Sequence, residues 1–247
     1  MRVALAQLLV EYSNKQANLE RALAMVDLAV ENRADFVVLP EACDLGWLSD
    51  SARLQAESLP GVWTNALVGK AREHRINIIS GLTRKEGGKV FNSALFIDRA
   101  GKLRFVFDKI NELDIGVPPY TRGRKLQAIP TPDFGLVGLH ICADAFIPEL
   151  TASLARMGCK VIFSPVAWAV KPGGEAANLA SLKAHYRARC QESKVWLIGA
   201  DSVGAVTEGP WAGRILQGDS PVCCPEGDFL LEGPTNEPAL LVVEVDL

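Results

Sequence analysis

The stretch Asp35-Phe36-Val37-Val38-Leu39-Pro40-Glu41 places a run of apolar residues directly before a proline and a carboxylate. A short, continuously apolar run of this kind is typical of a strand that is buried on both faces of a sheet. Such strands occur in α/β proteins, in which helices cover the sheet. Because Pro40 ends the run, Glu41 is predicted to lie just beyond the strand, at an edge of the sheet.

The rest of the chain alternates short strand-like runs with longer helix-like patterns. Asn14–Asn32 is predicted to be a helix because its apolar residues recur at three- and four-residue steps. Further helices are expected at about 61–74, Ile147–Met157 and Asn178–Ser193. The expected strands are Val3–Val10, Ile76–Leu82, Val90–Asp98, Leu103–Phe107, Leu126–Ile129, Leu136–Cys142, Val161–Phe163, Val195–Ala200 and Ala239–Val245. Since no linker or repeat interrupts this pattern, residues 1–247 are predicted to form one α/β domain with mixed strand directions.

Composition excludes several classes of function. The chain has 247 residues, of which 49% are hydrophobic, and a formal net charge of -3 from 26 basic and 29 acidic residues. This balance gives no electrostatic basis for a nucleic-acid or anionic-membrane partner. No apolar stretch approaches the roughly 18 uninterrupted residues that span a membrane. Gln7 interrupts the apolar N-terminal stretch and no cleavage site follows, so we interpret it as a strand and expect a cytoplasmic protein.

The six cysteines and three histidines are scattered along the chain, and no CxxC pair occurs. A zinc site is therefore not predicted. In a chain of this length without a secretion signal, the cysteines are expected to be reduced thiols. No glycine-rich phosphate-binding loop is present, so a nucleotide is not expected either.

Three reactive side chains follow expected buried strands, namely Glu41, Lys109 and Cys142. Functional sites of α/β proteins collect beyond strand ends, where loops converge on a rigid sheet. A thiolate is a nucleophile, a carboxylate can carry the thiol proton, and an ammonium group can stabilise an oxyanion. The backbone N–H of Ala143 is a candidate second oxyanion donor if the chain turns sharply there. Together these groups form a working set for acyl transfer.

Each of the three also has a structural interpretation. Cys142 can be a small buried hydrophobe, Glu41 can cap a helix, and Lys109 can be a solvated turn residue. Spacing alone does not decide between these interpretations and the catalytic one.

Two polar neighbours of Cys142 are interpreted as structural. In a regular strand His140 and Cys142 face the same side, with Cβ atoms roughly 6–7 Å apart, which is long for direct proton transfer. His140 is therefore predicted to be a hydrogen-bonded structural histidine, although a catalytic Cys–His pair is the alternative. Asp144 is expected to form a structural salt bridge, with Arg187 or Arg189 as its partner, although a catalytic carboxylate is the alternative.

The residues around the three reactive side chains resemble the motifs of the nitrilase superfamily. The glutamate motif is Asp35–Glu41 followed by Gly46, the lysine motif is Phe107–Asn111, and the cysteine motif is Gly138–Asp144 followed by Phe146–Leu150. Secondary matches occur in the same order at Ser80–Leu82, Phe91–Ala94, Ser164-Pro165 with Trp168, Arg189–Glu192, and Gly218–Ser220 with Pro225–Gly227. The resemblance runs from Val3 to about Val245.

This resemblance implies a four-layer α-β-β-α sandwich with mixed sheets, commonly paired into dimers through helices. It implies no metal and no organic cofactor. The implied reaction is hydrolysis of a nonpeptide C–N bond in a small amide, an N-carbamoyl compound or, less often, a nitrile. By position, Glu41 is the general base, Lys109 the oxyanion stabiliser and Cys142 the nucleophile.

The chain departs from the family pattern at two positions. The family usually has a second glutamate about eight residues after the lysine, where this chain has Val117; Glu112 and Asp114 are the candidate replacements. The family also usually has an aromatic residue after the cysteine, where this chain has Ala143. Loss of that aromatic bulk is expected to reshape the substrate pocket.

Three aromatic residues are further candidates for the pocket wall. Trp168 lies in the Pro/Gly-rich segment Pro165–Gly174, and Tyr120 lies in the irregular segment Ile110–Arg124. Trp47 follows the glutamate motif. Two functions remain open: an amidase-type hydrolase that forms a cysteine thioester with a small-molecule substrate, or a binding or regulatory protein with little turnover.

Overall fold

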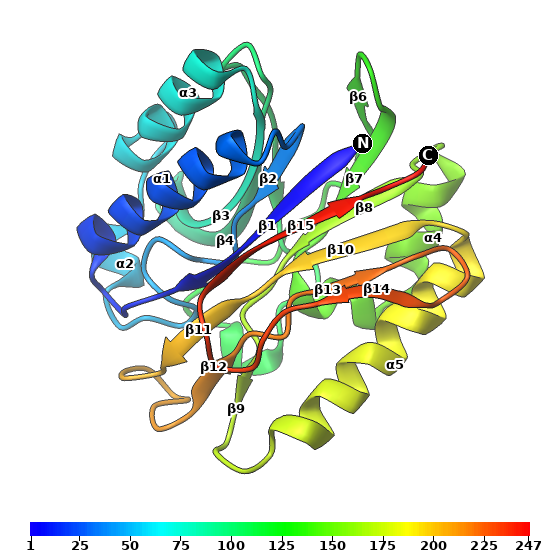
Figure 1. Ribbon diagram of the computed structural model, residues 1–247. Coiled ribbons are helices and arrows are strands. Elements are labelled where there is room, and N and C mark those ends of the chain that lie inside the picture. The colour runs from blue at the N-terminus through cyan, green and yellow to red at the C-terminus, as the bar shows by residue number, and fades with distance from the viewer.

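The buried strands lie in two mixed sheets that pack face to face, each covered on its outer side by helices (Figure 1). The computed structural model describes residues 1–247. Helices α1 (Lys15–Glu31) and α3 (Val62–His74) cover one sheet, and α4 (Pro148–Arg156) and α5 (Glu175–Ser193) cover the other. This is the four-layer α-β-β-α sandwich that the sequence motifs imply.

The first sheet is organised around its N-terminal strand, which has two neighbours along one edge. Residues 2–7 pair antiparallel with β15, and Leu8 and Leu9 pair parallel with β11, while β2 pairs parallel on the other edge. The strand order is β5-β4-β3-β2-β1-β11-β12-β9, with β15 beside β1. These strands are β1 (Arg2–Leu9), β2 (Phe36–Val38), β3 (Asn77–Glu86), β4 (Lys89–Ile97), β5 (Leu103–Asp108), β9 (Ala169–Val170), β11 (Ser202–Ala205), β12 (Ile215–Gln217) and β15 (Ala239–Glu244).

The second sheet has six strands in the order β14-β13-β10-β8-β7-β6. They are β6 (Ile129–Thr131), β7 (Gly135–Leu139), β8 (Val161–Pro165), β10 (Trp196–Ala200), β13 (Pro221–Cys223) and β14 (Phe229–Glu232). The remaining elements are the short helix α2 (Ala52–Gln55) and the 3₁₀ turns η1 (Asp114–Gly116) and η2 (Cys142–Phe146). None of the helices is both long enough and apolar enough to cross a membrane.

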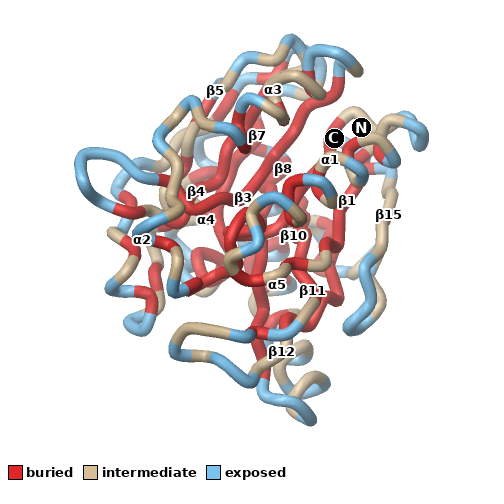
Figure 2. The backbone as a smooth tube through the Cα atoms, turned by 90° about the vertical axis from the view of Figure 1, so that its left-hand side faces the viewer, coloured by how far each residue is buried: buried red, intermediate tan, exposed pale blue.

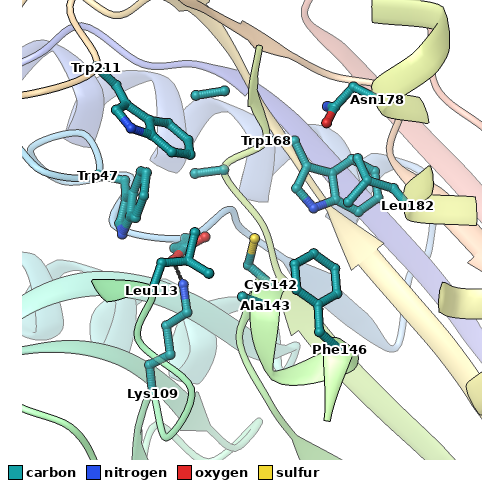
Figure 3. A pocket seen from close by; sticks show the side chains of 13 residues that line it. Trp47, Lys109, Leu113, Cys142, Ala143, Phe146, Trp168, Asn178, Leu182 and Trp211 are labelled. Atoms are coloured by element: carbon teal, nitrogen blue, oxygen red, sulfur yellow. Dashed lines mark hydrogen bonds and ion pairs between the residues drawn. The ribbon is translucent and has the colours of Figure 1, made fainter. Parts of the chain in front are cut away.

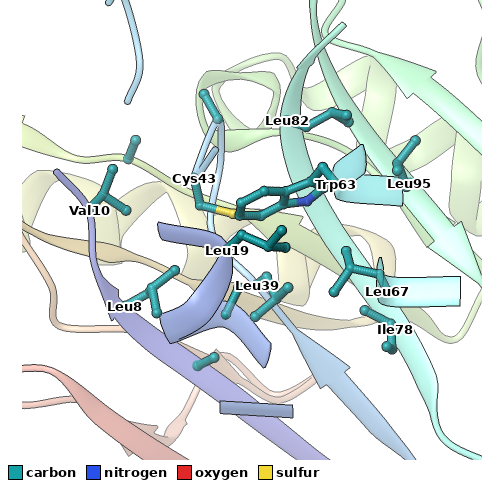
Figure 4. Close-up of a cluster of buried hydrophobic side chains, with 14 of the residues drawn as sticks. Leu8, Val10, Leu19, Leu39, Cys43, Trp63, Leu67, Ile78, Leu82 and Leu95 are labelled. Carbon is teal, nitrogen blue, oxygen red and sulfur yellow. The ribbon is translucent and has the colours of Figure 1, made fainter. Parts of the chain in front are cut away.

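Apolar side chains fill the layers between these elements. Between the sheets, the ring of Phe36 packs against Phe96 and Phe163, with ring centroids 6.2 and 5.1 Å apart. Under the helices of the first sheet, Trp63 lies among leucines and donates its indole N–H to Ser80 Oγ at 3.0 Å (Figure 4). Figure 2 shows that the central strands, such as β1, β3, β8 and β10, are buried along most of their length, whereas β15 is only partly buried. A core buried on both faces of each sheet holds the strand ends rigidly.

Three details differ from the pattern expected from the sequence. Strand β6 begins only at Ile129, so the strand expected at Leu126–Ile129 is displaced toward the C-terminus. The segment Pro165–Gly174 contains the two-residue strand β9, which pairs with β12. Strand β7 ends at Leu139 rather than at Cys142, because the chain turns there into η2.

Candidate active site

Glu41 and Lys109 form a buried ion pair at one edge of the first sheet. Lys109 Nζ lies 2.6 Å from Glu41 Oε1, and both side chains are 1% exposed. Asn92 Nδ2, from the neighbouring strand β4, donates to the same oxygen at 2.6 Å. The second oxygen of Glu41, Oε2, is buried without a hydrogen-bond partner in the protein. One carboxylate oxygen is therefore fixed by two donors, and the other remains able to accept a proton.

The pKa of Lys109 is raised above its ordinary value. Burial by itself disfavours the ammonium group, but the electrostatic interaction with Glu41, followed by those with Glu112 and Cys142, outweighs it. Lys109 therefore stays charged at every physiological pH, which an oxyanion-stabilising group requires.

The loop that carries Glu41 lies directly against strand β3. A Cβ atom at Gly81 would overlap the carbonyl oxygen of Pro40 and lie 2.6 Å from Cα of Glu41. The backbone of Gly81 also donates to Pro40 O at 3.0 Å, and Glu41 N donates to Val166 O at 3.2 Å. Glycine is thus required at position 81 because no side chain fits beneath the Glu41 loop.

Cys142 lies at the sharp turn between β7 and η2, with a φ of 45°, in the left-handed region. Non-glycine residues with such a backbone are uncommon and require support from their surroundings. Asp144 supplies it: its Oδ2 accepts from Ile141 N at 2.9 Å and its Oδ1 from Asn111 N at 2.6 Å. Asn111 Nδ2 in turn donates to Ala143 O at 2.6 Å. These bonds join the Cys142 turn to the loop that follows Lys109.

The expectation for the partner of Asp144 was wrong. Asp144 accepts from backbone amides, whereas Arg189 pairs with Glu192 at 2.8 Å and Arg187 donates to Gly227 O. Burial raises the pKa of Asp144 to about 6, against the opposing effects of the two backbone N–H groups and Lys109. The physical reason is that a carboxylate in this turn satisfies buried amides that have no other acceptor.

Burial also controls the protonation of Cys142 and His140. The pKa of the Cys142 thiol is well above its usual range, because burial and the charge of Glu41 outweigh Lys109 and a backbone hydrogen bond from Ala167. The resting sulfur is therefore a thiol that needs a proton acceptor. His140 is fully buried, its Nδ1 lies 3.1 Å from Ser164 Oγ, and burial lowers its pKa to about 3. The prediction of a hydrogen-bonded structural histidine is confirmed.

Glu41, Lys109 and Cys142 all line one cavity of about 130 Å³ (Figure 3). Among the expected wall residues, Ala143, Trp47 and Trp168 line it as well. The side chains that the sequence did not single out are Leu113, Phe146, Ala167, Ala169, Asn178, Leu182 and Trp211. Phe146 lies inside the cysteine motif, and this proximity was the only available signal for it.

Tyr120 does not line this cavity. Its ring belongs to the apolar cluster on the helix side of the first sheet, and its hydroxyl accepts from Leu48 N at 3.3 Å. The segment Ile110–Arg124 folds so that Tyr120 pairs with Val90 of strand β4, away from Cys142. Tyr120 therefore supports the Trp47 loop from behind and is not a pocket wall.

Of the two candidate replacements for the second glutamate, only Glu112 lies inside the protein. Glu112 is 2% exposed and neither of its oxygens has a hydrogen-bond partner. Burial raises its pKa to about 8, with Lys109 opposing and Glu41 reinforcing the shift. Asp114 instead has a fully exposed side chain that pairs with Arg122 at 3.1 Å, and Val117 is 44% exposed.

No three side chains of histidine, cysteine, aspartate or glutamate are arranged to hold a metal ion. The charged or nucleophilic side chains that line the cavity are the Cys142 thiol, the Glu41 carboxylate and the Lys109 ammonium group.

Comparisons with known proteins identify the family of the chain. The family model described as carbon-nitrogen hydrolase matches residues 2–247. An omega-amidase of Mus musculus is 31% identical over 260 aligned residues, covering 100% of this chain and 88% of its own, and its Homo sapiens counterpart is 29% identical with the same coverage.

Solved structures share the fold. A nitrilase-superfamily member of Saccharomyces cerevisiae superposes with a TM-score of 0.87 at 23% identity, covering 100% of this chain and 90% of that chain. An amidase of Nesterenkonia sp. AN1 superposes with a TM-score of 0.85 at 23% identity, covering 100% of this chain and 93% of that chain. With a matching family model over nearly its whole length, the chain belongs to the carbon–nitrogen hydrolase family, as an amidase-like member of the nitrilase superfamily.

Proposed function

We propose that this protein hydrolyses a small amide through a thioester on Cys142, with Glu41 as general base and acid and Lys109 as oxyanion stabiliser. The observation that carries the proposal is the unequal use of the Glu41 carboxylate. Oε1 accepts from Lys109 and Asn92, while Oε2 is buried without a partner. Glu41 lines the same cavity as Cys142, whose thiol has a pKa raised by burial. A carboxylate held in this way is oriented to take one proton.

In the first half of the reaction, Oε2 of Glu41 takes the thiol proton as Sγ of Cys142 adds to the amide carbon. Negative charge develops on the amide oxygen, and Lys109 Nζ stabilises it together with the backbone N–H of Ala143 at the start of η2. Glu41 then gives its proton to the leaving nitrogen. The C–N bond breaks, ammonia or an amine departs, and the acyl group remains on sulfur as a thioester.

In the second half, Glu41 takes a proton from water as the water oxygen attacks the thioester carbon. The same two donors stabilise the second oxyanion. Collapse of this intermediate releases the carboxylic acid, and the proton on Glu41 returns to sulfur. The sum is amide plus water giving acid plus ammonia or amine, with the enzyme unchanged.

Glu112 is proposed as a positioning residue for Lys109 that replaces the second glutamate of the family. Its buried carboxyl group lies close enough to Lys109 for each to shift the pKa of the other. It follows Lys109 by three residues and does not line the cavity. It is therefore suited to restrain the ammonium group rather than to touch the substrate.

Two further parts of the proposal concern the protein as a whole. We propose a homo-oligomer, a dimer or higher, because the family resemblance implies pairing through helices. We also propose a cytoplasmic location, supported by six free cysteines, five of them buried, which suit a reducing compartment. Light scattering of the purified protein tests the first part, and fractionation of cells tests the second.

The catalytic proposal is tested by ammonia release and intact-mass analysis with a panel of amides. The wild-type protein is expected to release ammonia and to show an acyl adduct on rapid quenching, and Cys142→Ala is expected to show neither. Tight binding without turnover, unaffected by Glu41→Gln, would instead identify the protein as a binding module.

A further inference from the structure

The walls of the cavity beyond the reactive groups are apolar or uncharged. Ten of the 13 lining residues are hydrophobic. In Figure 3 the indoles of Trp168, Trp47 and Trp211 and the side chains of Phe146 and Leu182 enclose the space around the sulfur of Cys142. The indole N–H groups of Trp47 and Trp168 are buried donors without partners, and they carry no formal charge.

The cavity also contains no cation that is free to bind a substrate anion. Its only charged lining residues are Glu41 and Lys109, which pair with each other at 2.6 Å. Arg214 contacts two of the lining residues but does not itself line the cavity. It stacks 3.7 Å from the ring centroid of Trp211 and donates to the backbone oxygen of Ala169 at 3.4 Å.

The cavity volume limits the part of a substrate that the protein encloses. An apolar cavity of about 150 Å³ accommodates benzene, which has six non-hydrogen atoms. The cavity here measures about 130 Å³. It therefore encloses roughly six or seven non-hydrogen atoms of a substrate, including those of the reacting amide group.

We propose that the substrate is the amide of a short, uncharged aliphatic acid, and that amides bearing a second carboxylate are rejected. This inference rests on the proposed hydrolase function and specifies its substrate class. A carboxylate buried in this cavity loses its hydration without gaining a counter-ion, since an N–H dipole supplies no opposite charge. An apolar substituent at the same place increases the affinity of the amide about fourfold for each carbon that is removed from water.

An isosteric pair of amides isolates charge from size. 3-Methylbutanamide and malonamate have the same number of non-hydrogen atoms, and the two methyl groups of the first are replaced by the two carboxylate oxygens of the second. We expect the wild-type kcat/KM for 3-methylbutanamide to exceed that for malonamate by at least 100-fold. Binding of both compounds to Cys142→Ala, measured by calorimetry, is expected to show the same preference without any need for turnover.

A pair of variants tests whether the lack of a free cation in the cavity causes the preference for 3-methylbutanamide over malonamate. Leu113 lines the cavity and is only partly buried, so a longer polar side chain is accommodated there. Leu113→Arg is expected to reduce the preference at least tenfold, whereas the uncharged control Leu113→Gln is not. Arg214→Gln is expected to leave the wild-type ratio unchanged, because the Arg214 side chain does not line the cavity.

The outcomes separate this inference from the catalytic proposal. If malonamate is turned over or bound within tenfold of 3-methylbutanamide, or if Arg214→Gln selectively abolishes its use, the inference is overturned while hydrolysis stands. If neither compound binds, the inference is likewise overturned. If no amide releases ammonia but Cys142→Ala prefers 3-methylbutanamide, the hydrolase proposal fails and the uncharged binding preference is supported.

Discussion

Oδ1 of Asp144 accepts a hydrogen bond from the backbone N–H of Asn111 at 2.6 Å. The two residues lie in segments that follow strands of different sheets. Asn111 follows Lys109 in the loop after β5, and Asp144 follows Cys142 in the turn after β7. The distance between the ammonium group and the sulfur is therefore controlled by a bond that neither of them makes. The second bond, from Asn111 Nδ2 to Ala143 O, fixes the same junction.

Replacement of Asp144 by asparagine is expected to loosen this junction. An amide group offers only one acceptor oxygen, so the N–H of Ile141 or of Asn111 loses its partner. A buried unsatisfied group costs about 1–3 kcal/mol of unfolding free energy. For a protein of this size that lowers Tm by about 2–4 °C per kcal/mol. We expect kcat to fall while the KM for the amide changes little, as measured by steady-state kinetics and thermal unfolding.

The control for this prediction is Asp114→Asn, which removes a carboxylate from an exposed side chain. Its effect on Tm is expected to stay within the range of ordinary surface substitutions. An Asp144→Asn protein with wild-type Tm and wild-type kcat would show that the junction does not depend on this carboxylate.

The Glu41→Gln variant separates the two roles of the Glu41 side chain. Glutamine keeps an oxygen for Lys109 Nζ and Asn92 Nδ2, but places an NH₂ group where Oε2 is proposed to accept the thiol proton. General acid–base catalysis is worth roughly 10²–10⁴-fold, so kcat is expected to fall by that factor in a folded protein. Asn92→Ala removes only one supporting donor and should cost much less. Equal losses in the two variants would contradict the assignment of Oε2 as the proton acceptor.

Glu112 is expected to make the stability of the protein depend on pH. Its pKa is about 8 in the folded protein and has an ordinary value of 4.5. Between these values the unfolded chain has released the proton while the folded protein still holds it. The folded state binds more protons, so unfolding free energy falls as pH rises through this window and levels off above about pH 8.

Denaturant unfolding of Glu112→Gln at several pH values checks this sign. Relative to this variant, the wild-type protein should lose stability from about pH 5 to pH 8, because glutamine does not titrate. The exposed control Glu226→Gln should follow the wild-type curve. If Glu112 restrains Lys109, the Glu112→Gln variant should also show a lower kcat with little change in KM. If the free energies of unfolding of the wild type and Glu112→Gln depended on pH in the same way, the buried Glu112 would not titrate as predicted.

How far the sequence predicts this site depends on where each residue lies along a strand. Glu41 and Lys109 follow apolar runs, and because such runs form buried strands, the apolar pattern alone places both residues at strand ends. Cys142 was expected at the end of a strand, but strand β7 ends three residues earlier, at Leu139. The turn depends on Asp144 finding two backbone amides, and no sequence period encodes that choice.

The cavity wall was less predictable for the same kind of reason. Trp211 reaches the site from an irregular segment between β11 and β12, and its edge packs against Trp47 with centroids 4.9 Å apart. Tyr120 is equally aromatic and also lies in an irregular segment, yet it points into the core behind that wall. Loop conformation is decided by tertiary packing and not by local propensity, so composition did not distinguish the two.

The close approach of β3 to the Glu41 loop gives the sharpest test of how the scaffold controls the chemistry. In Gly81→Ala, the new methyl group overlaps Pro40 O and contacts the backbone of Glu41, so the loop has to move. A shift of about 1 Å is enough to cost about 10²-fold in a precisely positioned reaction. Overpacking of this kind also typically destabilises a protein by about 1–3 kcal/mol.

Gly69→Ala is the matched control, because a Cβ there meets nothing within 4 Å and lies within helix α3. It should stabilise the protein by up to about 1 kcal/mol and leave kcat unchanged. Steady-state kinetics and Tm of the two variants decide the matter: a Gly81→Ala enzyme as active as Gly69→Ala would mean that the position of Glu41 does not limit the rate.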